Sequence, residues 1–399
     1  MMMSSEEVVI LPEDLIFRIL SFLPLKSVVR FKTVCKSWRC SIIETSTFAH
    51  QHLLHQYEEN YSFILLDPHC GIRGIGSNNT TRPKLSLVTP HDTHNFQQQI
   101  IFDSPDGCEY SDCTLTISVC NGIICLHTYD GFRYRLYHDK LSISLWNPAT
   151  NKYTVLPPSP FPPPFDRNYC PISIGFGLDV KNNHYKLVRI FTFRGQGSRV
   201  SHVEVYNLTT DSWRIVDAVL PIHVIISDPK SPYRNGTYCW LGRAFPCYQD
   251  MYGSNVMDTL ICSFDFTDEV FGTVVLPDVD SVKSALYPQL AIIRDDIALI
   301  NRVHDSHFEI WALKEYGVRE SWTKIFKIGP FLWPKLLGIS WTGHNLLFVN
   351  NNQLCMYDLL TQETKNLQTQ GSSLSLRTLE VAIYNESLVG IERGNGAAN

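Results

Sequence analysis

A loose repeat of strand-like segments constrains what this 399-residue chain can fold into more than any other feature. Each segment places apolar residues at every second position, reaches an aromatic residue and, in most copies, continues into Asn, Asp or Thr, as a strand and its turn do. The aromatic residues stand 60, 58, 47 and 46 positions apart and are Trp146, Tyr206, Phe264, Trp311 and Tyr357. This spacing fits repeated four-stranded sheets that are joined by loops of variable length.

A companion strand precedes most of these segments, in the runs CNGIICLH, NGTYCWLGR, DDIALINR and GHNLLFVNN. Repeated sheets bury their faces only against neighbours, and closing them into a ring protects their edges. We therefore predict a mainly β fold, a kelch-like β-propeller of about six blades, with a degenerate first blade near residues 61–66. A last strand, residues 381–391, is free to close the ring. The main alternative is a multi-layer pair of β-sandwiches, because the repeat spacing is irregular.

Helical periodicity is confined to the stretch from Leu11 to Leu53. There Leu11, Leu15 and Ile19 recur every four residues, which predicts an amphipathic helix. Pro12 suits the first turn of this helix, where a missing N–H group costs nothing.

The pair Leu23-Pro24 ends the first helix, since a proline disfavours helical geometry in the residue before it. A second helix is predicted over residues 25–34, and a third is lined by Cys35, Trp38 and Ile42. The histidines that follow the third helix, His50, His52 and His55, are interpreted as part of a solvated segment. Three short helices bury little apolar surface, so we expect this module, residues 5–55, to need a partner. The alternative is a helical cap that only packs on the following domain, residues 56–399.

The run LPEDLIFRIL…LPLKSVVRFKTVCKSWRCSI resembles an F-box, the motif that binds the Skp-family adaptor of cullin-based ubiquitin ligases. The LPEDL opening, the second LP pair and the CKSW segment carry this resemblance. It implies that twelve residues form or support the adaptor contact: Leu11, Pro12, Leu15, Ile19, Leu20, Leu23, Pro24, Val28, Arg30, Cys35, Lys36 and Trp38.

The remainder of the chain resembles the plant F-box-associated (FBA) domain in the segments CNGIICL, LWNPATNKYTVLP, GFGLDVKNNHYKLVRI, VEVYNLTTDSWRIVD and IYNESLV. Within that family the F-box and blade sequences are similar to those of the S-locus F-box group of pollen proteins. That resemblance implies non-self S-ribonucleases as targets. The polar stretch 74–99 is expected to be a long surface loop, a type of segment that often contacts ligands.

Composition narrows the class of protein. A net charge of −5 gives no reason to expect nucleic acid binding, and no apolar run is long enough for a membrane helix. We expect an intracellular protein of the cytoplasm, with the nucleus as a second location, whose 12 cysteines are mostly free thiols. None of the cysteine pairs has CxxC spacing, so we predict no metal site and no cofactor.

Catalytic motifs are also missing from the sequence. The GIRGIG run lacks the Lys-Ser/Thr ending of a phosphate-binding loop, and no Gly-x-Ser-x-Gly elbow occurs. The F-box and FBA resemblance implies a non-enzymatic substrate receptor of an SCF-type ubiquitin ligase, with the Skp-family adaptor, a cullin and a protein substrate as partners. The alternatives are an FBA protein with an unrelated target in defence or hormone signalling, a binding module that acts outside any ligase, and a copper-containing propeller enzyme.

Overall fold

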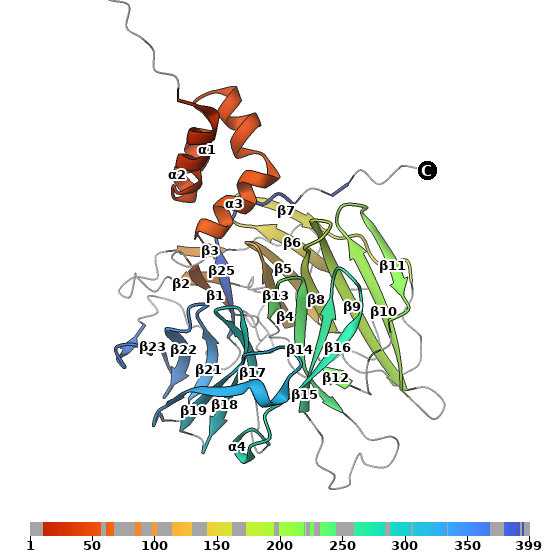
Figure 1. Cartoon of the computed structure of the whole chain (residues 1–399), viewed down its shortest axis with the longest axis vertical. Helices are drawn as coiled ribbons and strands as arrows, with labels where there is room; N and C mark the ends of the chain where they lie inside the picture. Colours follow the sequence, from red (N-terminus) through yellow and green to blue (C-terminus); the bar gives the residue numbers. More distant parts are fainter. Residues whose placement is uncertain are drawn as a thin grey trace, which may run out of the picture.

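The computed structural model places an all-helical module beside a ring of β-sheets (Figure 1). It describes residues 11–56, 61–67, 84–88, 98–101, 114–129, 142–161, 173–194, 199–218, 220, 224–226, 232–244, 259–283, 288–304, 306–332, 334–367, 379–391 and 393–394. None of the helices among these residues is both long and apolar enough to cross a membrane.

The helical module contains four segments: α1 (Glu13–Ser21), α2 (Leu25–Phe31), the π-helix η1 (Trp38–Ile43) and α3 (Ser46–Gln56). Pro12 and Pro24 are the residues that immediately precede α1 and α2, and the carbonyl of each accepts hydrogen bonds from the first turn of its helix. The two Leu-Pro pairs therefore mark the two helix starts, as the sequence predicts.

The predicted third helix corresponds to η1, but the sequence interpretation missed α3, the helix that follows it. Thr45 Oγ1 accepts the backbone N–H of Phe48 at 3.2 Å, a side-chain cap that begins α3 as a separate helix after η1. The interpretation of the three histidines as solvated also fails at His52, which lies on α3, is fully buried and contacts Leu23 O through Nε2 at 2.9 Å.

Six antiparallel sheets form the blades of a propeller, which confirms the predicted fold. Blade 1 contains β25 (Glu380–Asn385), β1 (Tyr61–Asp67), β2 (Lys84–Val88) and β3 (Gln98–Ile101). Blade 2 contains β4 (Thr114–Cys120), β5 (Ile123–Tyr129), β6 (Ile143–Asn147) and β7 (Lys152–Val155). Blade 3 contains β8 (Ser173–Asp179), β9 (His184–Arg194), β10 (Arg199–Asn207) and β11 (Ser212–Val216).

The remaining blades follow the same order. Blade 4 begins with a broken inner strand and contains β12 (Val224–Ile226), β13 (Tyr233–Arg234), β14 (Thr237–Ala244), β15 (Thr259–Asp265) and β16 (Phe271–Val275). A short helix, α4 (Asp280–Lys283), leads to blade 5, which contains β17 (Gln289–Ile293), β18 (Asp296–Val303), β19 (His307–Leu313) and, after the 3₁₀ turn η3 (Arg319–Ser321), β20 (Trp322–Ile328). Blade 6 contains β21 (Lys335–Ile339), β22 (Asn345–Asn350), β23 (Gln353–Asp358) and β24 (Thr364–Asn366).

The last strand closes the ring, as predicted. β25 pairs with β1 in antiparallel register, with Tyr61 opposite Asn385 and Phe63 opposite Ile383. An apolar cluster fills each of the six junctions between neighbouring blades. Each blade therefore buries its faces only against its neighbours, which is why the sequence pattern repeats.

The five repeated aromatic residues all lie on the third strand of a blade. In blades 2, 3 and 4 each faces another aromatic residue on the fourth strand, as in the pair Tyr206 and Trp213, whose ring centroids lie 5.2 Å apart. In four blades the next residue is Asn or Asp, and its Oδ1 accepts the backbone N–H groups two and three positions later; these residues are Asn147, Asn207, Asp265 and Asp358. The repeat thus encodes an Asx turn that joins the third strand to the fourth, and in three blades the two aromatic residues on either side of this turn pair with each other.

The expected long loop at residues 74–99 is partly wrong, because β2 and the start of β3 lie within it. The alternation in Lys84-Leu-Ser-Leu-Val88 is the strand signal. Residues 74–83 and 89–97 lie outside the described residues.

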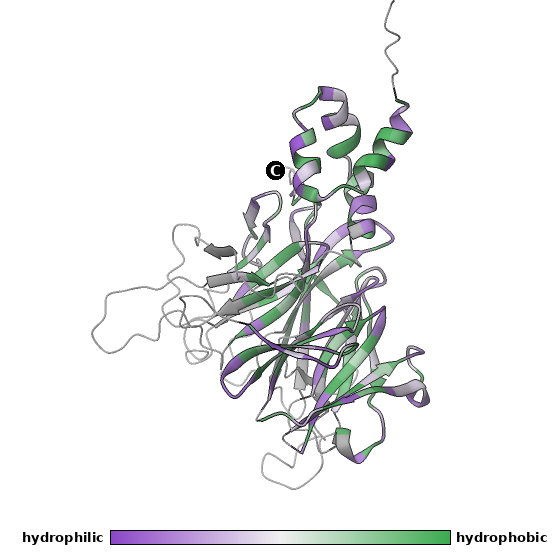
Figure 2. Ribbon diagram, turned by 90° about the vertical axis from the view of Figure 1, so that its left-hand side faces the viewer, coloured by the Kyte–Doolittle hydropathy of each residue, from purple (hydrophilic) through white to green (hydrophobic). Residues whose placement is uncertain are grey.

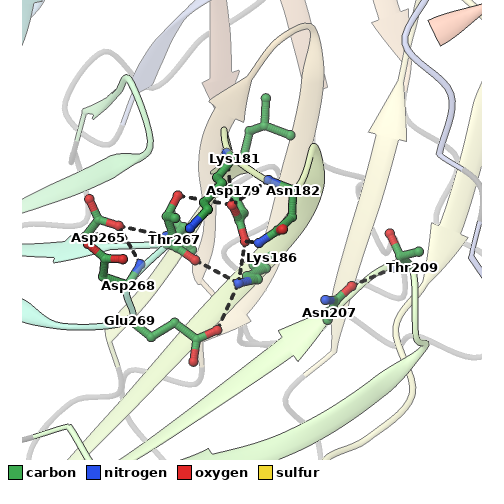
Figure 3. Close-up of polar contacts among 12 residues, drawn as sticks. Asp179, Lys181, Asn182, Lys186, Asn207, Thr209, Asp265, Thr267, Asp268 and Glu269 are labelled. Atoms are coloured by element: carbon green, nitrogen blue, oxygen red, sulfur yellow. Dashed lines mark hydrogen bonds and ion pairs between the residues drawn. The ribbon is translucent and has the colours of Figure 1, made fainter.

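A buried network of polar side chains joins blades 3 and 4 (Figure 3). Lys186 Nζ lies 2.7 Å from Asp179 Oδ2 and donates to Phe266 O at 2.8 Å and Glu269 Oε1 at 2.9 Å. Asp179 is completely buried, and Thr267 Oγ1 donates to it at 3.1 Å. Burial raises the pKa of Asp179, but the hydrogen bonds from Lys186, Asn182 and Thr267 outweigh burial and hold that pKa well below its usual range.

Candidate functional site

A row of exposed apolar side chains runs along the outer face of α1. Leu11, Leu15, Ile19 and Phe22, at intervals of four, four and three residues, are 48%, 46%, 52% and 60% exposed. The opposite face of α1 holds the helix on its module: Leu20 is buried, and Phe17 packs edge-on against Phe48 of α3 at 5.2 Å. One helix therefore carries two apolar faces, of which the outer one is uncovered in the isolated chain.

The helical module is rich in such side chains. Seven of the fifteen large apolar residues that are exposed among the described residues belong to residues 11–54. Figure 2 shows hydrophobic residues, in green, in this module as well as along the strands of the propeller. A short helical module that leaves this much apolar surface uncovered has the composition of a docking surface.

The structure separates the twelve predicted adaptor residues into two groups. Leu20 and Val28 are buried in the core of the module, and Leu23 and Trp38 are half-buried. The other eight are exposed: Leu11, Pro12, Leu15, Ile19, Pro24, Arg30, Cys35 and Lys36. The first group can only support the surface, whereas the second can touch a partner.

Exposed basic residues accompany the apolar row. Arg18, Lys26, Arg30 and Lys36 are all exposed. Glu44 is engaged within the module, where Arg39 Nε donates to its Oε1 at 3.1 Å and Lys32 Nζ lies 3.6 Å away. The hydrogen bond from Arg39 lowers the pKa of Glu44. Glu13 and Asp14, in the first turn of α1, are exposed as well. Residues 11–56 contain six Lys or Arg against three Asp or Glu, so the module is net positive, which suits an acidic partner.

Sequence reasoning missed Phe22, the most exposed residue of the row. Its ring lies 4.1 Å from that of His55, at the end of α3. The available signal was its position, since residue 22 continues the spacing of Leu11, Leu15 and Ile19.

A short C-terminal segment joins the helical module to the propeller. We call residues 386–391, which follow β25, the C-terminal strap. Leu388 packs in the apolar core of the helical module, and Ile391 packs in the cluster between blades 2 and 3. Val389 contacts both clusters. The strap is therefore part of two cores at once, and it links the helical module to blades 2 and 3.

Asn147, at the end of β6, holds the strap in place. Its side chain is fully buried, and Nδ2 donates to Ser387 O at 3.0 Å and to Val389 O at 2.8 Å. Gly122 in the β4–β5 turn allows the close approach: a Cβ atom there would lie 2.3 Å from Ser387 Cβ, and its φ of +76° also favours glycine. The β4–β5 turn and the β6–β7 turn of blade 2 therefore both contact the strap.

The described residues contain no cluster of three or more His, Cys, Asp or Glu side chains that could hold a metal ion. Five cysteines lie buried in strands: Cys120, Cys125, Cys239, Cys262 and Cys355. Burial raises the pKa of Cys125, Cys239 and Cys262 to about 12, so these thiols stay protonated and behave as small apolar side chains.

Comparisons with known proteins agree with this arrangement. The family model of the F-box domain matches residues 9–44, and that of the F-box associated β-propeller domain matches residues 91–384. An F-box/kelch-repeat protein of Arabidopsis thaliana is 26% identical over 320 residues, which cover 80% of this chain and 79% of the relative. Another Arabidopsis thaliana F-box protein is 27% identical over 356 residues, 81% of this chain and 73% of the relative.

Among solved structures, a sialidase of Trypanosoma rangeli has a TM-score of 0.41 at 10% identity, over 77% of this chain and 51% of that chain. A score this low supports no conclusion about activity. The propeller family model alone spans well over half of the chain, and the helical module carries the second family match. The chain therefore belongs to the F-box proteins that carry an F-box associated β-propeller domain.

Proposed function

We propose that this chain is the substrate receptor of an SCF-type ubiquitin ligase. The F-box binds a Skp-family adaptor that is attached to a cullin, and the propeller holds a protein target close to the ubiquitin-charged enzyme. The chain itself performs no chemistry. Its contribution is effective concentration, because tethering turns ubiquitin transfer from a bimolecular encounter into a local one.

The observation that carries this proposal is the uncovered row of Leu11, Leu15, Ile19 and Phe22 on α1. Each side chain is about half exposed, so covering it contributes roughly 1 kcal/mol, half the value for burying a fully exposed apolar side chain. The exposed basic residues add attraction for an acidic adaptor at long range. The eight exposed residues of the predicted adaptor contact are thus the ones that we propose to touch the adaptor.

The target is proposed on separate grounds. The similarity to the S-locus F-box group suggests that the chain acts in pollen and that its targets are non-self stylar S-ribonucleases. These are commonly basic, and the net charge of −5 suits a basic target. Binding would take place in the cytoplasm, where the ligase works.

Ile19→Asp is expected to weaken adaptor binding by about 100-fold without changing the stability of the chain. The substitution removes one apolar contact and places an uncompensated carboxylate in the covered interface, which together cost roughly 3 kcal/mol. In the free chain the carboxylate is hydrated, because position 19 is half exposed. Surface plasmon resonance with purified adaptor and the thermal unfolding midpoint measure the two quantities.

The matched control is Leu360→Asp, the same chemical change at a 66% exposed position on the propeller. It should bind adaptor like the wild type. Equal adaptor binding by Ile19→Asp and wild type would contradict the proposal. When Ile19→Asp and Leu360→Asp are used as baits in mixed pollen and style extract, both should recover the same target. If Leu360→Asp recovers the adaptor without a ribonuclease, the ligase role stands and the S-ribonuclease assignment is wrong.

A further inference from the structure

The hub of the propeller contains a cavity of about 150 Å³. We call it the hub cavity. Its walls come from the inner strands β4, β17, β21 and β25, together with the segment that carries Tyr233, and it extends to Asn121 in the β4–β5 turn. This cavity has no part in the adaptor contact, so the inference below does not depend on the proposed function.

Small side chains beside the hub keep the cavity open. Residues 289–292 of β17 all line it: Leu290 and Ile292 are buried in the cluster between blades 4 and 5, whereas Gln289 and Ala291 alternate with them and are half-buried. Alternation of this kind places Gln289 and Ala291 on the side of β17 that faces blade 6, where Ala291 packs against the cluster between blades 5 and 6. Gly338 of β21 also lines it, and a Cβ atom there would be 3.4 Å from its nearest neighbour.

The lining selects against charged ligands. Among the described residues that line the hub cavity there is no Asp, Glu, Lys, Arg or His. An ion that entered this site would lose its hydration without meeting a partner of opposite charge, which is costly. An uncharged ligand avoids this cost.

The walls also favour an aromatic ring of limited size. Tyr233 and Trp341 supply two aromatic surfaces, and the Tyr233 ring is held firmly because its hydroxyl donates to Leu178 O and accepts from Gly236 N, both at 2.9 Å. An apolar cavity of about 150 Å³ accommodates benzene in another protein. The volume therefore matches one aromatic ring with a small substituent.

Amide side chains at the edge of this space supply a place for one polar group. Gln289 Nε2 donates to Leu336 O at 3.4 Å, a distance well beyond that of a strong hydrogen bond, and Asn121 Nδ2 donates to the Tyr185 hydroxyl at 3.1 Å. An amide offers both a donor and an acceptor, so Gln289 is able to exchange its long bond for a better one with a ligand hydroxyl.

We propose that the hub cavity is a binding site for a small, uncharged aromatic molecule, one ring in size and carrying a single hydroxyl or similar polar group. The ring packs between Tyr233 and Trp341, and the polar group bonds to the Gln289 amide.

Phenol, toluene and benzoate are the probes that test this proposal on the purified full-length chain. Titration calorimetry should show one phenol site, with benzoate binding at least tenfold more weakly because it carries a charge. Ala291→Leu should abolish phenol binding by filling the cavity. The control Val270→Leu adds a methylene at a 55% exposed position outside the cavity and should bind phenol like the wild type.

Gln289→Leu keeps the volume but removes the amide, and it should weaken phenol about tenfold while toluene is unaffected. This variant also serves if Ala291→Leu fails to fold, as judged by its circular dichroism. The proposal is overturned if the wild type shows no saturable phenol binding at millimolar concentration, if benzoate binds as tightly as phenol, or if Gln289→Leu binds phenol unchanged.

Discussion

Leu388→Asp in the C-terminal strap is expected to unfold the F-box module and abolish adaptor binding, although it lies more than 330 residues from the module in sequence. Leu388 packs in the core of the module with Leu20, Val28 and Phe48. Truncating a buried leucine costs about 2–5 kcal/mol, and a buried unpaired carboxylate costs more. A module of 46 described residues, 11–56, has too small a core to offset this loss.

The propeller of this variant should remain folded, because the interblade clusters do not contain Leu388. Limited proteolysis followed by mass spectrometry should therefore show new cleavage within residues 11–56 and none within the described blades. Leu360→Asp is again the matched control. If Leu388→Asp binds adaptor with wild-type affinity and resists proteolysis, the strap is not part of the F-box core and the two domains are independent.

Asn147→Ala should give an intermediate result in the same assays. It leaves the Ser387 and Val389 carbonyls without their donor and removes the Asx turn after β6. Losing these bonds costs about 1–3 kcal/mol. The strap would be loosened but not expelled, so we expect partial proteolysis and a reduced, measurable affinity for the adaptor.

Local sequence signals predicted the fold well. An Asx turn requires only an Asn or Asp side chain that accepts a backbone N–H two residues later, and a proline marks a helix start, so the roles of Asn207 and Pro24 could be predicted without their distant neighbours. Ring closure by β25 followed from the count of strands. The helix α3 was missed, because its histidines were interpreted as a solvated segment and its start depends on the side-chain cap from Thr45.

The strap could not be predicted. The sequence analysis predicted one strand over residues 381–391, because apolar residues return after Ser387, whereas β25 ends at Asn385. What redirects the chain is tertiary: Asn147 binds its carbonyls, and the helical module covers Leu388. The sequence also could not show which residues of α1 are exposed, since Leu15 and Leu20 have the same chemistry and differ only in what packs against them.

The buried network between blades 3 and 4 escaped prediction for a related reason. Asp179 and Lys186 belong to residue types that usually lie at the surface, and neither alternation nor composition shows that their loops converge. Thr267 and Glu269 come from the β15–β16 turn, about 80 residues further along the chain. Only the packing of two blades brings these four groups together (Figure 3).

Lys186→Met is expected to lower the free energy of unfolding by about 3–5 kcal/mol at pH 7, because it leaves Asp179 charged and buried without its cation. The double variant Asp179→Asn/Lys186→Met should recover at least half of this loss, since a neutral amide still accepts the N–H groups of Lys181 and Asn182. Urea unfolding of wild type and both variants measures the effect. A single variant as stable as the wild type would show that water reaches Asp179.

The pH dependence of this loss gives a further check on its cause. In the wild type the folded pKa of Asp179 lies below its unfolded value of 3.8, so the network stabilises the chain above about pH 4, and this stability falls as pH drops through the folded pKa. In Lys186→Met, burial without the cation should raise the folded pKa above 3.8, and acidification then favours the folded form of the variant. The stability gap between the two chains should therefore narrow from pH 7 to pH 4. A gap that stays constant over this range would assign the effect of Lys186 to lost packing of its methylene groups, because packing does not titrate.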